Sequence, residues 1–259
     1  MKIVVCVKQV PDTYSERRLD EGDKTLDRAS ADGVINELDE YAIEEALLLA
    51  EKHEGEVTVL TMGPDKATDS IRKALSMGAD KAVHVVDDSL HGADAVQTSA
   101  ALAAALGQVE FDVVVLGSES TDARMSVVPA MLAERLGLPQ LTYANKVEID
   151  GSSISVQRQT EYGYDKVEAS LPAVVSVVEK INEPRYPSFK GIMAAKKKEV
   201  ASKDVAGLGL SGDAVGLANA PTEVTEFTAA PPREKGAVVT DEGDGGVKIA
   251  EYLASQKIL

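Results

Sequence analysis

A segment of small and hydroxyl-bearing residues is suited to binding an anion. Gly117–Asp122 reads Gly-Ser-Glu-Ser-Thr-Asp, follows an apolar run and leads into a stretch with helical spacing. Backbone N–H groups and hydroxyls at the amino end of a helix bind phosphate, because the helix dipole favours negative charge there. Serine and threonine are also common helix caps, which is the alternative role of this segment.

Other residues could contact a nucleotide beside that segment. Asn36–Asp39 precedes the first helical stretch, where it either caps that helix or meets Gly117–Asp122 at one edge of a sheet. Cys6 and Met62 end two strands that we expect to be neighbours. Core packing is the default role of both, and a contact to a base or ribose is the sharper hypothesis.

The signatures of several common enzyme classes are missing from the chain. No G-x-G-x-x-G follows the first strand, and neither G-x-x-x-x-G-K-[ST] nor G-x-S-x-G occurs, which disfavours a dinucleotide dehydrogenase and a hydrolase. A single cysteine, Cys6, excludes an intramolecular disulfide and a cysteine-based zinc site. Only His53, His84 and His91 remain, so we expect no metal centre and no catalytic residue.

A basic cluster near the carboxyl end opposes the overall charge of the chain. Lys190 and Lys196–Lys198 flank an apolar stretch, directly after a loop of proline, serine and glycine that carries Phe189. One interpretation is a solvated basic helix. The other is a docking surface, because an exposed aromatic side chain beside cations is typical of one.

Composition limits the partners that the chain can have. The 259 residues contain 27 Lys plus Arg against 43 Asp plus Glu, a net charge of −16, which repels nucleic acid. The 15 uncharged residues of Ala95–Val109 are too few and too polar to cross a bilayer. The apolar run Ile3–Val7 is too short for the core of a signal peptide, so we expect a cytoplasmic protein without membrane insertion.

The elements that must position these residues alternate between two hydrophobic periods. Short apolar strands are predicted at Lys2–Val7, Glu56–Met62, Lys81–Val86 and Phe111–Leu116, and helices at Glu40–His53, Ala67–Met77, Ala93–Gly107 and Met125–Leu136. Such alternation predicts a doubly wound, mainly parallel α/β sheet of the Rossmann-like, adenine-nucleotide-binding type. Its ligand crevice lies beyond the carboxyl ends of the strands.

The pattern changes after residue 140. An antiparallel hairpin appendage at about 141–170 is predicted from Thr142–Ile149, Ser152–Gln159 and Lys166–Ser170, and Ala173–Val178 is predicted to rejoin the main sheet. Val200–Gly246 has no sustained period and reads as an extended arm, which ends in a helix at Val247–Ile258. We therefore predict a domain at 1–199 and an arm at 200–259. Because the arm has no core of its own, it implies a partner chain.

Several segments resemble one known family. They are Ile3–Thr13, Ala67–Asp80, Gly117–Asp122 with Leu136–Gln140, and Asn182–Lys198, which reads NEPRYPSFKGIMAAKKK. Together they resemble the beta subunit of electron transfer flavoprotein, and the last segment is the most specific. The resemblance implies a heterodimer with an alpha subunit that holds most of the FAD, while the beta subunit binds a structural AMP. It also implies a non-enzymatic electron carrier between flavin dehydrogenases, such as acyl-CoA dehydrogenases, and a quinone-linked acceptor.

The resemblance also assigns residues. Thr13 and Tyr14 fall near the flavin, and Phe189 falls on the apolar residue of the partner-recognition loop. The basic residues beside it, Lys196, Lys197 and Lys198, complete the predicted docking surface. The AMP contacts fall on Cys6, Asn36, Glu37, Leu38, Asp39, Met62, Gly117, Ser118, Glu119, Ser120, Thr121, Asp122, Ala123, Arg124, Met125, Ser126, Val127 and Val128. Relatives often have G-x-Q-A-I-D in this loop, so the chain departs from them here, and Arg124 could itself meet a phosphate.

Two other functions remain open. Electron-bifurcating members of the family bind a second FAD in place of AMP, and the sequence does not distinguish them. A nucleotide-binding regulatory module that resembles universal stress proteins would share the sheet. It would need neither the Phe189 loop nor the arm, which favours the electron carrier.

Overall fold

The computed structural model describes residues 1–232, 236 and 238–258. The chain forms two units, Met1–Thr225 and Glu226–Leu259, each of which is described by itself. Within the described residues, the first contains the strands and five α-helices, of which the last is α5 (Phe189–Ala195), and the second contains α6 (Gly245–Ser255).

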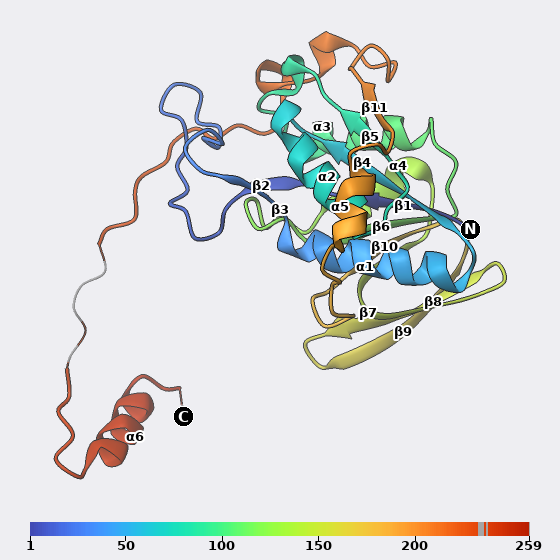
Figure 1. The fold of residues 1–259 in the computed structure, drawn as a ribbon. Coiled ribbons are helices and arrows are strands. Elements are labelled where there is room, and N and C mark those ends of the chain that lie inside the picture. The colour runs from blue at the N-terminus through green and yellow to red at the C-terminus, as the bar shows by residue number, and fades with distance from the viewer. Residues whose placement is uncertain (233–235, 237, 259) are drawn as a thin grey trace. The chain divides into compact units, whose positions relative to one another are not determined.

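A nine-stranded sheet with the order β11-β5-β4-β1-β6-β10-β7-β8-β9 runs through the first unit (Figure 1). The strands from β11 to β7 pair in parallel, and β8 and β9 continue antiparallel. Their bounds are β1 (Lys2–Cys6), β4 (Glu56–Met62), β5 (Lys81–Val85), β6 (Val113–Gly117), β7 (Gln140–Asp150), β8 (Ser153–Thr160), β9 (Gly163–Ser170), β10 (Ala173–Val177) and β11 (Val200–Lys203). The predicted mainly parallel sheet with an antiparallel extension is confirmed.

Helices cover both faces of this sheet. One apolar core lies between the sheet and α1 (Glu37–Lys52) with α2 (Thr68–Met77), and the other between the sheet and α3 (Ala95–Leu106) with α4 (Val128–Leu136) (Figure 1). Alternate residues of a strand point to opposite faces, so Val5 belongs to the first core and its neighbour Val4 to the second. This burial on both faces explains why the central strands are almost entirely apolar.

The segment between β6 and α4 differs from the prediction. The helix expected at Met125 begins at Val128 instead. Arg124 and Ser126 have φ angles of 50° and 57°, in the left-handed region that a right-handed helix cannot contain. The predicted anion loop is therefore longer than its sequence suggests, and two of its residues have left-handed backbone before the helix starts.

A small second sheet escaped the sequence analysis. β2 (Gln9–Pro11) pairs antiparallel with β3 (Gly33–Ile35), and together they hold the ends of a long loop at residues 12–32. Strands of three residues are too short to show a period of two, so no pattern predicts them.

The arm begins later than the predicted boundary at Val200. β11 pairs in parallel with β5 and extends the main sheet, and Val205, Leu208 and Val215 are buried in the core beside α3 and α4. The first unit therefore extends to Thr225. These apolar residues are spread among glycines without a regular spacing, so the sequence conceals their burial.

The second unit contains α6 (Gly245–Ser255), a helix in the region where one was predicted. Its apolar side chains Val247, Ile249 and Tyr252 are all 61% exposed. Across the residues that the structure describes, no helix is both long and apolar enough to cross a bilayer.

Candidate functional site

Gly117 brings two predicted site segments together at the carboxyl edge of the sheet. It ends β6, and a Cβ atom at this position would lie 2.6 Å from Asp39 Oδ1 and 2.8 Å from the carbonyl carbon of Leu38. Only a glycine therefore allows residues 117–122 to pack directly on the amino end of α1. The structure places the two segments side by side, as their positions after β6 and before α1 suggested.

Asn36 joins these segments through its side-chain amide. Its Nδ2 donates to the Glu119 carbonyl oxygen at 2.9 Å and to Asp39 Oδ1 at 2.9 Å, and its Oδ1 accepts from Thr121 N at 3.0 Å. Asn36 occupies the N-cap position of α1, but its side chain accepts no hydrogen bond from a backbone N–H of the first turn; its partners are the Asp39 carboxylate and the 117–122 loop. The capping interpretation is thus correct for its backbone and wrong for its side chain.

Asp39 is a buried carboxyl group at this junction. Its Oδ2 accepts from Lys8 N at 2.7 Å. Burial raises the pKa of Asp39 to about 7, although hydrogen bonds from Asn36, Lys8 and Gly117 favour the ionised form. The charge of the site therefore changes near neutral pH.

Cys6 and Met62 lie where core packing was the default expectation. Cys6 is buried in the core formed with α3 and α4, and Met62 packs against the same core. Burial raises the pKa of the Cys6 thiol, so it stays neutral and is a poor nucleophile.

Three cations that the sequence did not point to also hold the 117–122 loop. Lys8 Nζ lies 2.8 Å from Asp122 Oδ1, and an Arg28 guanidinium nitrogen lies 3.1 Å from Asp122 Oδ2. Arg17 donates to the Thr121 carbonyl oxygen at 2.5 Å. Burial alone would raise the pKa of Asp122, but the charges of Lys8 and Arg28 and the hydrogen bonds lower it to about 2. Asp122 is therefore a permanent anion that ties the 12–32 loop to the site.

The junction contains unused hydrogen-bonding capacity of the kind that an anionic nucleotide needs. Thr121 Oγ1 is buried and has no hydrogen-bond partner within the described part of the chain. The N-cap residue of α4 is Val127, whose side chain has no acceptor for the N–H groups of the first turn. Pro129 has no N–H, so a phosphate at the start of this nine-residue helix would accept from the N–H groups of Val128 and Ala130, and the residues fit the ligand.

Comparison with known proteins identifies the family. A model described as the electron transfer flavoprotein domain matches residues 23–208. The chain is 57% identical over 263 residues to the electron transfer flavoprotein subunit beta of Mycobacterium tuberculosis, covering 99% of both chains. The corresponding subunit of Megasphaera elsdenii is 37% identical over 271 residues, covering 100% of both. The caffeyl-CoA reductase-Etf complex subunit CarD of Acetobacterium woodii is 37% identical over 242 residues, covering 93% of this chain and 92% of CarD.

The chain belongs to the electron transfer flavoprotein beta-subunit family. Members of this family are electron-carrier subunits, so the chain is a carrier and not an enzyme. A beta subunit of an electron transfer flavoprotein implies an alpha-subunit partner.

The two residues expected near the flavin lie in the 12–32 loop of this beta subunit. Thr13 Oγ1 is 3.4 Å from Glu37 Oε1 at the start of α1, and Tyr14 is 96% exposed. The same loop is tied to the candidate nucleotide site through Arg17 and Arg28. The loop that carries Thr13 and Tyr14 is therefore held to the site, but these two residues are not part of the buried interior of the site.

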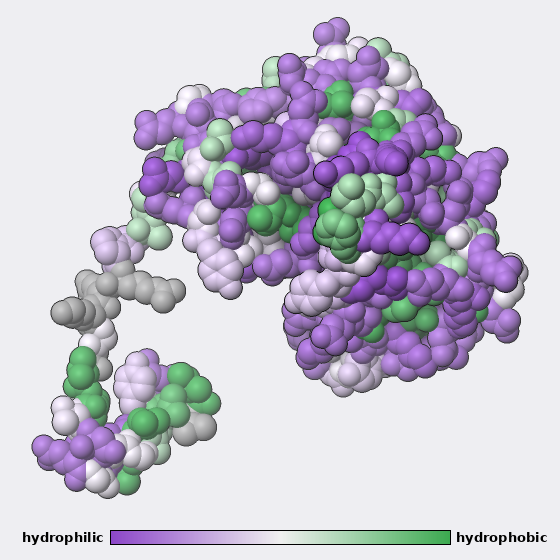
Figure 2. Space-filling view, viewed as in Figure 1, coloured by the Kyte–Doolittle hydropathy of each residue, from purple (hydrophilic) through white to green (hydrophobic). Residues whose placement is uncertain are grey.

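The predicted docking segment forms the short helix α5 (Phe189–Ala195) rather than an open loop. Ser188 Oγ caps it by accepting from Gly191 N at 3.0 Å, and Phe189, its first residue, is 82% exposed. Figure 2 shows hydrophobic residues over α5 beside strongly hydrophilic surface. Lys196 and Lys197 are exposed, whereas the Lys198 ammonium donates to backbone carbonyls at the end of α2.

The chain before α5 is fixed to α1. Arg185 donates to both carboxylate oxygens of Glu44, at 2.8 and 2.9 Å, and to Glu51 at 2.6 Å. Asn182 Nδ2 donates to Glu45 Oε2 at 3.1 Å. Hydrogen bonds to Glu44 and Glu51 raise the pKa of Arg185, so this anchor is permanently charged.

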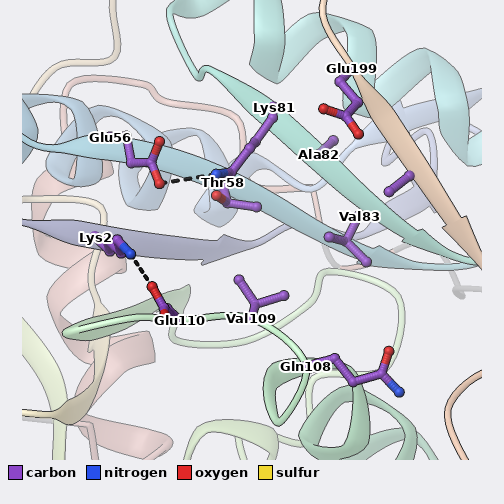
Figure 3. Close-up of a pocket in the computed structure, with 11 residues that line it drawn as sticks. Lys2, Glu56, Thr58, Lys81, Ala82, Val83, Gln108, Val109, Glu110 and Glu199 are labelled. Carbon is purple, nitrogen blue, oxygen red and sulfur yellow. Dashed lines mark hydrogen bonds and ion pairs between the residues drawn. The ribbon is translucent and has the colours of Figure 1, made fainter.

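A separate depression of about 270 Å³ lies at the other edge of the sheet (Figure 3). Lys2, Glu56 and Lys81 line it from the amino ends of β1, β4 and β5, and Lys81 pairs with Glu56 at 3.0 Å. Ligands of parallel α/β sheets bind at the carboxyl ends, and the two lysines here already pair with Glu110 and Glu56, so we assign it no function. The described residues contain no group of side chains able to hold a metal ion.

Proposed function

We propose that this beta subunit binds AMP where residues 36–39 meet residues 117–128, while FAD is held mainly by the alpha subunit. The observation that carries the proposal is the buried Thr121 hydroxyl without a partner in the described chain, in the loop that leads to the uncapped start of α4. AMP has no redox role, and the flavin supplies the electron transfer.

Different segments of this chain would bind different parts of the nucleotide. The loop from Gly117 to Val128 offers backbone N–H groups and hydroxyls to the phosphate, and the exposed Arg124 offers a positive charge. Residues 36–39 form the opposite wall, where Asn36 holds the loop in place. Thr13 and Tyr14 belong to the surface that approaches the flavin.

The second part of the proposal concerns partners. Flavin dehydrogenases, such as acyl-CoA dehydrogenases, dock on Phe189, with Lys196 and Lys197 steering their approach, and a quinone-linked oxidoreductase takes the electrons onward. Phe189 is exposed at the start of α5 and is therefore free to be buried by a partner. Aromatic side chains that become buried on binding contribute much of the binding energy of interfaces, which supports this role. The unit Glu226–Leu259 wraps the alpha subunit through the exposed apolar side chains of α6.

A nucleotide count tests the cofactor assignment. The subunit is co-expressed with its alpha subunit, and the purified heterodimer is denatured so that the released FAD and AMP can be measured by absorbance and chromatography. We expect about one AMP per heterodimer, since one helix start offers one phosphate site. We also expect about one FAD, which is held mainly by the alpha subunit. Two FAD and no AMP would establish the alternative, an electron-bifurcating subunit with a second FAD in place of AMP.

A pair of isosteric variants tests the position of the site. Thr121→Val removes the hydroxyl that lacks a partner and should lower the retained AMP. Thr58→Val is the matched control, because Thr58 is also buried but lies in β4 beside the opposite edge of the sheet. Equal AMP content in the two variants would contradict the proposed site.

A further inference from the structure

The helix that carries Phe189 is too small to hold itself in place. α5 has seven residues, and Ala195 is the one among them that is buried. Isolated helices of this length are marginal in water, and most helix stability in proteins comes from packing. An apolar groove of about 590 Å³, lined partly by Pro187 and Ile192, runs beside α5 against α2, so side-chain packing leaves that side unfilled. Other contacts must therefore fix the orientation of α5.

Two cations provide these contacts: one from α2 bonds carbonyls at the end of α5, and one from the chain after α5 bonds carbonyls at the end of α2. Arg72 of α2 donates to the carbonyl oxygens of Ala195 at 2.6 Å and of Lys198 at 3.0 Å, at the end of α5. Lys198 Nζ donates to the carbonyl oxygens of Leu75 at 3.1 Å, Gly78 at 3.3 Å and Ala79 at 2.5 Å, at the end of α2. Carbonyls at a helix end lack intrahelical partners, and the helix dipole favours cations there. Each helix thus receives a cation from the chain of the other.

A close backbone contact completes the arrangement. A Cβ atom on Gly191 would lie 2.4 Å from the Ser76 carbonyl oxygen, so α5 approaches α2 as closely as a glycine allows. Small displacements of α5 would break this contact together with the two sets of hydrogen bonds. Because Phe189 is the first residue of α5, its direction depends on the same contacts.

We propose that Arg72 and Lys198 are positioning residues for the docking of donor dehydrogenases. They hold α5 on α2 so that Phe189 is presented in one orientation before the dehydrogenase arrives, and they do not themselves touch the dehydrogenase. The proposal rests on the docking role proposed for Phe189. Affinity gains from such preorganisation, because the cost of ordering the anchor is met before binding.

The test uses the holo heterodimer and a purified acyl-CoA dehydrogenase, with reduction of the heterodimer by the substrate-loaded dehydrogenase as the readout. Lys198→Met removes the clamp, and Lys197→Met is the matched control that removes the same charge from an exposed neighbour. We expect Lys198→Met to raise the KM for the heterodimer about tenfold, at low and high salt alike, with kcat unchanged. Lys197→Met should raise KM at low salt only, because screening removes the effect of an exposed charge. Arg72→Lys, which keeps the charge but loses the guanidinium whose Nη1 donates to both carbonyls, should resemble a weaker Lys198→Met.

A double-mutant cycle separates positioning from direct contact. In a Phe189→Ala background, Lys198→Met should have no further effect on KM, since there is no anchor left to orient. Additive effects, or a loss that high salt abolishes as for Lys197→Met, would show that Lys198 acts as a docking charge and would overturn the proposal. Unchanged KM for Lys198→Met would overturn it too. An unchanged KM for Phe189→Ala alone would instead refute the docking function on which the proposal depends.

Hydrogen exchange supplies a readout without the dehydrogenase. Backbone amides of residues 190–198 should exchange faster in Lys198→Met than in Lys197→Met, because local opening of α5 becomes easier. Equal exchange in the two variants would contradict the clamp.

Discussion

Replacing Gly117 by alanine tests the contact on which the candidate site is built. The added methyl group would lie 2.6 Å from Asp39 Oδ1, 2.8 Å from the carbonyl carbon of Leu38 and 2.9 Å from Leu38 Cβ. The Leu38 atoms cannot yield by rotation of a flexible side-chain end, so the substitution must displace the loop from the start of α1. Overpacking of this kind costs about 1–3 kcal/mol.

The expected loss is large enough to measure in a melting experiment. In a domain of this size, 1 kcal/mol changes Tm by roughly 2–4 °C, so Gly117→Ala should lower Tm by roughly 2–12 °C. The same heterodimer should retain less AMP, because residues 118–121 move with the loop.

Gly107→Ala is the matched control for the loss of a glycine. Gly107 follows α3 with a φ of −63°, and its Cβ would have no neighbour nearer than 3.5 Å. Alanine should there leave Tm unchanged or raise it, since the substitution stabilises by about 0.4–1 kcal/mol where no strain arises. A Gly117→Ala protein that matched the wild type in both Tm and AMP content would refute the steric argument.

Three further predictions follow from burial and charge. Phe189→Ala should change the free energy of unfolding by no more than about 0.5 kcal/mol, because the side chain is 82% exposed. It should nevertheless raise the KM of donor dehydrogenases for the heterodimer roughly thirtyfold, and a marked loss of Tm would contradict the docking role. Deleting Glu226–Leu259 should leave the Tm of the free beta subunit unchanged but abolish its co-elution with the alpha subunit in size-exclusion chromatography. Deleting the chain from Val200 onward should instead unfold the beta subunit, since β11 and the core residues after β11 are lost. Burial raises the pKa of Asp39 from 3.8 to about 7, so the folded state binds a proton that the unfolded state releases, and the protein loses stability as pH rises from about 4 to about 7. Between pH 5 and pH 7.5 the Tm of the wild type should therefore fall more than the Tm of Asp39→Asn. Parallel plots of Tm against pH for the two proteins would refute the pKa shift.

The sequence by itself determined the mainly parallel α/β class of the sheet, its antiparallel extension and the family. The central strands are apolar because helices cover both faces of the sheet, and that pattern is visible in any short window of residues. The Asn182–Lys198 segment carried the family resemblance without any structure. Residue types along one segment were enough for both.

The tertiary structure alone decided which groups meet at the site. Lys8 and Arg28 reach Asp122 across more than 90 positions of the chain, and Asn36 meets Thr121 across 85. Residues 12–32, which supply two of the cations that hold the loop, have no period from which their path could be predicted.

The tertiary structure also separated residues that look alike in sequence. Lys197 and Lys198 are adjacent members of one basic run, but Lys197 is exposed, whereas the Lys198 ammonium donates to carbonyls at and just after the end of α2. The first unit likewise continues to Thr225 because scattered apolar residues after Val200 find a core beside α3. A local pattern records the face that an element buries, whereas a side chain's partner depends on how distant elements pack, and that information is spread over the whole chain.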